Sequence, residues 1–198
     1  MLIRTSQPTG LVISVEDVKE QTEVEVGDLT REALLERFIR AATVHFEGRT
    51  GRFLLPIDLE LKLQFFTDPL LIPAAPIRSI TEVVYLDEDH AEQTVDAAEY
   101  VFQRTNAGGA LHFDEDFTFP TLSSRPDRVT VRFMAGYDDP WASGAGGDPE
   151  TAPNPIDATL VALLTAQWFM HREPTTNEII RRVPFGLEDL IADRRIYR

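Results

Sequence analysis

Side chains that carry out chemistry are sparse and scattered in this chain. The sequence has no cysteine, which excludes disulfides, thiolate zinc sites and cysteine nucleophiles. No two of its histidines (His45, His90, His112 and His171) have the close spacing that a pair of zinc ligands uses on one strand or helix. No serine lies in the Gly-x-Ser-x-Gly pattern of a nucleophile elbow. We therefore expect a protein without catalytic residues, metal or cofactor.

One acidic cluster, Asp114-Glu115-Asp116, follows shortly after His112. Carboxylates of this kind bind hard cations, but the glycine and the distal glutamate of a calcium-binding loop are missing. The pattern favours a solvated acidic loop. A metal-dependent hydrolase that uses His112, Asp114 and Asp116 is the least favoured alternative.

The negative charge of the chain is unevenly distributed. The formal net charge is −14, and residues 87–150 contain 14 acidic but only 4 basic residues, whereas residues 151–198 contain 6 of each. An acidic surface repels phosphate, so tight binding along a DNA backbone is not expected.

Hydrophobic periodicity predicts two helices near the N-terminus. Ser14 is a suitable cap for a short helix that runs to about Thr22. A longer helix begins after Asp28 and carries an apolar stripe at helical spacing, and Gly48 is its expected end. That stripe consists of Leu35, Phe38, Ile39, Ala42 and Phe46.

Strand patterns fill the middle of the chain. Apolar and polar residues alternate from Leu59 to Phe65, and Ile80–Leu86 and Val129–Phe133 are rich in strand-forming residues. Tyr100–Phe102 and Ala110–Phe113 are separated by a glycine-containing turn and predict a hairpin. These segments predict a small antiparallel sheet.

The C-terminal part begins with residues 138–154, a Gly- and Pro-rich stretch that predicts a flexible loop. Asn154 and Pro155 then start a helix that has no charged residue from Ala158 to Met170, so we expect it to be covered on nearly all sides. That apolar run is too short to cross a bilayer, and the start of the chain lacks a hydrophobic leader, so we expect a soluble, non-exported protein. A last short helix is predicted at Leu187–Ala192.

Together these elements predict an α+β fold with an N-terminal helix pair, a small antiparallel sheet, a long apolar C-terminal helix and an extended helical arm. We expect an N-terminal extension at residues 1–13, a main α+β domain at residues 14–172 and a C-terminal arm at residues 173–198.

The order of these pieces resembles the head-to-tail connector (adaptor) family of tailed phages and gene transfer agents, over about residues 14–198. The resemblance is carried by structural motifs that follow one another in the family's order. They are Glu47-Gly48-Arg49-Thr50-Gly51-Arg52 after the helix pair, the segment from Leu70 to Tyr85, Val129 to Tyr137, Pro155-Ile156 before the apolar helix, and Pro184-Phe185-Gly186-Leu187 before Arg194-Arg195-Ile196-Tyr197.

The resemblance implies a structural subunit of an oligomeric ring, commonly a dodecamer, in the neck of a virion or phage-like particle assembled in the bacterial cytoplasm. The implied partners are the portal protein on one side and a stopper or tail-terminator protein on the other. Double-stranded DNA would pass through the lumen without specific binding, and no membrane is involved. Another neck or tail-completion protein is the alternative interpretation.

The C-terminal arm is the predicted portal-docking element, because arginine and aromatic side chains are strong anchors at protein interfaces. The residues of this hypothesis are Arg181, Arg182, Phe185, Arg194, Arg195 and Tyr197.

Overall fold

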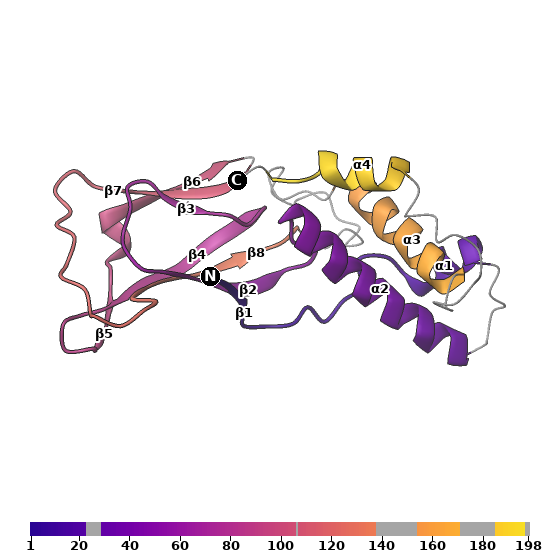
Figure 1. The fold of residues 1–198 in the computed structure, drawn as a ribbon, viewed down its shortest axis with the longest axis horizontal. Helices are drawn as coiled ribbons and strands as arrows, with labels where there is room; N and C mark the ends of the chain where they lie inside the picture. The colour runs from indigo at the N-terminus through magenta and orange to yellow at the C-terminus, as the bar shows by residue number, and fades with distance from the viewer. Residues whose placement is uncertain (23–28, 106, 138–153, 171–184, 197–198) are drawn as a thin grey trace.

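The chain has a helical end and an end built of β-sheets (Figure 1). The computed structural model describes residues 1–22, 29–105, 107–137, 154–170 and 185–196. The main class predicted from the sequence, α+β with antiparallel strands, is confirmed.

Helix α1 (Val15–Thr22) begins where the sequence predicted. The Ser14 hydroxyl accepts a hydrogen bond from the Asp17 amide at 3.1 Å, and the Asp17 carboxylate accepts one from the Ser14 amide at 3.3 Å. This reciprocal cap satisfies amide groups that the first turn leaves without a helical partner.

Helix α2 (Leu29–Thr50) runs past its predicted end. Gly48 lies inside the helix, so its prediction as the terminator is wrong. The chain leaves the helix at Gly51, whose φ of 77° is the left-handed conformation of a C-terminal cap and whose amide donates to the Glu47 carbonyl at 2.9 Å.

Helix α3 (Pro155–Met170) begins at the predicted cap, because the Asn154 side chain accepts a hydrogen bond from the Ile156 amide at 3.1 Å. The expectation of a long apolar helix covered on nearly all sides is not supported. Leu163 is 43% exposed and Met170 is 69% exposed, so one side of the helix faces solvent. The helix lacks charged residues between Ala158 and Met170, which led to the prediction that it is buried on every side. Only part of its surface is packed against other elements.

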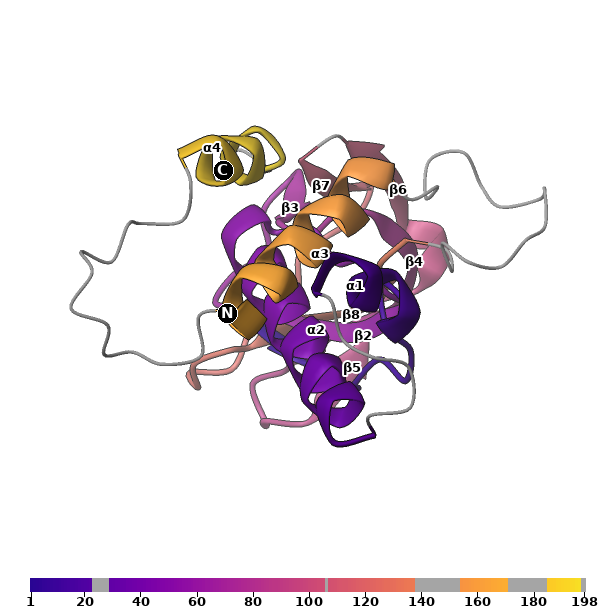
Figure 2. The same ribbon diagram turned by 90° about the vertical axis from the view of Figure 1, so that its right-hand side faces the viewer.

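Helix α4 (Phe185–Asp193) lies at the edge of the bundle formed by α1, α2 and α3, as the end-on view in Figure 2 shows. None of the helices within the described ranges is both long and apolar enough to span a membrane.

The strands form two antiparallel sheets, where the sequence predicted a single small one. A five-stranded sheet has the order β1-β2-β8-β4-β5, and a three-stranded sheet has the order β3-β7-β6. The five-stranded sheet consists of β1 (Leu2–Arg4), β2 (Ile57–Leu63), β4 (Ile77–Leu86), β5 (Glu92–Thr94) and β8 (Val129–Ala135). The three-stranded sheet consists of β3 (Leu70–Ile72), β6 (Tyr100–Thr105) and β7 (Gly108–Phe113), and a 3₁₀ turn, η1 (Ala97–Glu99), precedes β6.

The predicted hairpin is confirmed, since β6 pairs with β7 from Tyr100–Phe113 to Thr105–Gly108. Strands β1, β3 and β5 were not predicted. Each has three residues, which is too short to show a period of two. The extension predicted at residues 1–13 contains β1, and Val12 and Ile13 are buried among the helices.

The described residues form two hydrophobic clusters. One lies among the helices and includes Phe46, Leu160 and Ile191, and the other lies between the two sheets and includes Leu111 and Phe133. The segment after α2 joins them, because Phe53 belongs to the sheet cluster whereas Leu54 and Leu55 belong to the helical cluster.

Candidate interaction surfaces

The residues after α4 are fixed to the body of the protein by a buried ion pair. The Arg194 guanidinium donates to both oxygens of the Asp157 carboxylate, at 2.6 and 2.8 Å. Asp157 is buried in the first turn of α3, and Arg194 is mostly covered. The hydrogen bond to Asp157 raises the pKa of Arg194 above its usual value. Arg194 is therefore committed to a contact within its own chain.

Further hydrogen bonds hold the same segment. The Arg52 side chain donates to the Arg194 carbonyl at 2.7 Å and to the Tyr137 hydroxyl at 3.2 Å, and the Ile196 amide donates to the Thr50 carbonyl at 2.9 Å. Ile196 is buried against Gly51, where an added Cβ would lie 2.7 Å from the Ile196 side chain. We call this set of contacts the C-terminal latch.

The other predicted docking residues are divided between exposed and undescribed positions. Arg195 is exposed. Phe185 is the first residue of α4, but the structure does not describe its side chain. Arg181, Arg182 and Tyr197 lie wholly outside the described residues. Of the flexible loop predicted at residues 138–154, residues 138–153 also lie outside the described residues.

The acidic cluster does not form a metal site with the residues described. His112 lies on β7, and its Nε2 is 3.1 Å from the Gln103 side-chain oxygen, while the exposed Asp114, Glu115 and Asp116 follow the strand. Among the described residues, no three His, Asp or Glu side chains are grouped closely enough to hold a metal ion. The hydrolase alternative thus lacks a preformed site in this part of the chain.

A charge network crosses one face of the five-stranded sheet. Arg132 on β8 makes ion pairs with Glu60 at 3.0 Å, Glu82 at 2.7 Å and Glu92 at 3.3 Å, which come from three other strands. The hydrogen bonds that Arg132 donates to Glu82 and Glu60 raise its pKa. Lys62 also approaches Glu60, at 4.0 Å, so this network combines two cations with three carboxylates.

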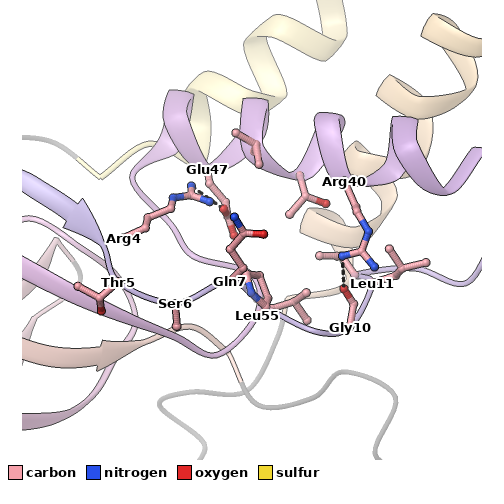
Figure 3. Close-up of a pocket in the computed structure, with 13 residues that line it drawn as sticks. Arg4, Thr5, Ser6, Gln7, Gly10, Leu11, Arg40, Glu47 and Leu55 are labelled. Carbon is pink, nitrogen blue, oxygen red and sulfur yellow. Dashed lines mark hydrogen bonds and ion pairs between the residues drawn. The ribbon is translucent and has the colours of Figure 1, made fainter.

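A pocket of about 410 Å³ lies between the N-terminal segment and α2 (Figure 3). Its apolar lining includes Leu11, Val12, Val44 and Leu55. Its polar lining includes Arg4, which is held at 2.8 Å from the Glu47 carboxylate, and Arg40, which approaches the Gly10 carbonyl at 3.4 Å and pairs with Glu36 at 2.8 Å. We call this site the arginine pocket. No sequence pattern predicted this pocket, because its two sides, residues 4–12 and 40–55, are far apart along the chain.

Glu47 is the buried acid of this pocket. Its carboxylate accepts hydrogen bonds from the Leu54 amide and from Arg4, each at 2.8 Å, and only 3% of the side chain is exposed. Burial raises the pKa of Glu47 above its usual value, and the two hydrogen bonds oppose that effect only in part. Glu47 thereby links β1, α2 and the segment after α2.

The described chain is an elongated α+β protein, in which four helices pack at one end of two antiparallel sheets. Two ion pairs described above, Arg4 with the buried Glu47 and Arg194 with the buried Asp157, hold segments of the chain in place. Solved chains with this fold come from gene transfer agent particles. A chain of the virion of a native particle matches with 24% identity and a TM-score of 0.74. A chain of the neck of an empty particle, computed with C6 symmetry, matches with 25% identity and a TM-score of 0.73, and a chain of the neck of a native particle, computed with C12 symmetry, matches with 24% and 0.72.

Each of these matches covers 100% of this chain and 96% of the solved chain. The resemblance predicted from the sequence is therefore confirmed at the level of the fold, from the first strand to the last helix. No family model and no curated protein matches the chain.

Proposed function

We propose that the chain is a structural head-to-tail adaptor subunit in the neck of a gene transfer agent or phage-like particle. The observation that carries this proposal is the match over the whole chain to subunits of such necks, at TM-scores of 0.72 to 0.74. The match includes the helical end, the two sheets and the C-terminal helix, so it extends beyond one shared motif.

In this role the chain forms a ring between the portal protein and a tail-side stopper or terminator. The C12 symmetry of one matching neck supports a dodecamer. The acidic balance of the chain supports a lumen through which DNA slides, because acidic side chains offer phosphates no counterion sites. The absence of a grouped metal site among the described residues fits a structural role better than the hydrolase alternative.

The test is assembly with the portal protein of the same particle, observed by negative-stain microscopy and native mass spectrometry. We expect a ring of twelvefold symmetry seated on the portal. Binding to a tail component without any binding to the portal would instead identify another neck or tail-completion protein.

We also propose that the C-terminal segment docks on the portal, with Arg195 replacing Arg194 as its described cation, because Arg194 is occupied by Asp157. Arg195→Gln should weaken capture of the portal protein. Arg49→Gln, at an exposed arginine of α2, is the matched control. Equal capture by both variants would contradict a docking role for Arg195.

A further inference from the structure

The loop after β7 presents aromatic rings beside carboxylates at the far end of the sheets. Asp114–Asp116 are exposed, and Phe119 is 46% exposed. The Phe119 ring is nevertheless held in place by three neighbouring rings, whose centroids lie 5.1 to 5.6 Å away. These neighbours are Phe66, Phe113 and Phe117. A ring already fixed in place loses little conformational freedom when a partner covers it. We call residues 114–119 the acidic-aromatic tip.

The arginine pocket has the complementary character. Val44, which is 54% exposed, lies on the same side of α2 as Arg37 and Arg40, because these residues are three, four and seven positions apart. Leu11, Val12, Val44 and Leu55 give the pocket apolar lining, the pair of Arg4 with the buried Glu47 lies among them, and Arg40 also lines the pocket. Arg37 is outside the lining, one turn before Arg40 on α2. The pair between Arg40 and Glu36 is half exposed, and surface pairs of this kind contribute little stability and can exchange partners.

The tip and the pocket lie in different halves of the molecule. In Figure 1 the loop after β7 is at the left end, whereas α2, which lines the pocket with Arg40, Val44 and Glu47, lies to the right of the sheets. A chain therefore cannot place its own tip in its own pocket. Two different complementary patches on one chain give a head-to-tail contact, which closes into a ring when the rotation between neighbours allows it.

We propose that the arginine pocket receives the acidic-aromatic tip of a second copy of this chain. Phe119 packs against the apolar side chains of the lining, and the carboxylates of residues 114–116 meet Arg40 and, one turn before it on α2, Arg37. Each copy then offers its tip to one neighbour and its pocket to the other. The inference rests on the proposed ring, and it specifies which surfaces form the ring contact.

Cysteine cross-linking tests the contact directly, because the natural chain has no cysteine. The double variant Val44→Cys with Thr118→Cys, assembled on the portal protein and oxidised, should give a ladder of covalent multimers. The control combines Val44→Cys with Val101→Cys, since Val101 is 62% exposed on β6 but lies outside residues 114–119, opposite His112. A disulfide needs its two Cβ atoms within about 4 Å, so this nearby position tests whether the tip itself makes the contact. Rings without a ladder, or an equal ladder from the control, would overturn the proposal.

If no ring forms on the portal, the proposed function fails while the contact can still be tested. The same double variant is then oxidised as the free chain over a range of concentrations. A ladder that grows with concentration and is absent from the control supports the contact. Absence of a ladder at every concentration overturns it.

Two matched substitutions at exposed positions measure how much the proposed contact contributes to the strength of assembly. Val44→Glu should weaken assembly by about 30-fold, the loss typical of an interface hot spot, because the new carboxylate repels the tip. Val101→Glu is matched in residue type and exposure and should leave assembly unchanged. Weaker assembly with Val101→Glu alone would assign the ring contact to the three-stranded sheet instead.

Discussion

Two buried carboxylates, Asp157 and Glu47, fix segments that are distant in sequence. Asp157 holds Arg194 of the C-terminal latch, and Glu47 holds Arg4 of β1. In the sequence, Asp157 is an ordinary acidic residue in the first turn of a helix. Its partner lies 37 positions away, and a pattern read along the chain does not show such a contact.

Because Arg194 and Asp157 form a buried ion pair, removal of the Asp157 side chain should strongly destabilise the protein. Asp157→Ala should lower the free energy of unfolding by about 3 kcal/mol, because it leaves a mostly covered guanidinium without its partner. Arg195→Ala, at the exposed neighbouring position, should change it by less than about 0.5 kcal/mol. Urea unfolding at neutral pH measures both, and similar values for the two variants would contradict the buried pair.

Glu47 predicts a pH dependence of definite sign. Because burial raises the pKa of Glu47 from its usual value near 4.5, the folded state binds the proton more tightly than the unfolded state does. The free energy of unfolding of the natural chain, relative to Glu47→Gln, should therefore be highest below about pH 4.5. It should fall as the pH rises through the raised pKa. Urea unfolding of both proteins over a pH series tests this, and a difference that increases with pH would contradict it.

At the scale of elements, the two glycines near the end of α2 have opposite roles. Gly51→Ala should destabilise the protein by at least about 1 kcal/mol, because of its φ of 77° and the close approach of Ile196. Gly48→Ala should stabilise it by about 0.5 to 1 kcal/mol, because Gly48 is inside the helix with open space around it. Thermal unfolding compares the two, and destabilisation by Gly48→Ala would place the helix end where the sequence first indicated.

Elements with a sustained period were predictable from the sequence. The alternation in β2 and the cap of α1 are local signals, and both led to the correct element. The division into two sheets was not predictable, because it depends on which strands pair, and β3 pairs with β7 across about forty residues of chain. The arginine pocket and the C-terminal latch depend on the same kind of long-range contact.

At the scale of the whole molecule, α4 is part of the helical core and not a free arm. Leu187, Ile191 and Ile196 are buried, and Arg194 neutralises Asp157. Deletion of residues 184–198 should therefore lower the free energy of unfolding by about 5 kcal/mol or more, since it exposes apolar surface and leaves a buried carboxylate unpaired. Urea unfolding of the shortened chain is the measurement, and an unchanged midpoint would contradict the packing of α4.

This expectation changes how docking should be tested. A deletion that yields DNA-filled heads without tails would follow from an unstable subunit as well as from a lost portal contact. Neutralisation of the exposed Arg195 separates the two explanations, because that side chain is not part of the buried latch.

The last turn of α2 is the point where both ends of the described chain are anchored. Arg4 of β1 is bound to Glu47, and Ile196 is bound to Thr50, within one turn of the same helix. A pulling force applied to the C-terminal segment would enter α2 directly and pass on to β1, which is the edge strand of the five-stranded sheet. The three-residue pairing of β1 with β2 would therefore carry mechanical load before the rest of that sheet did.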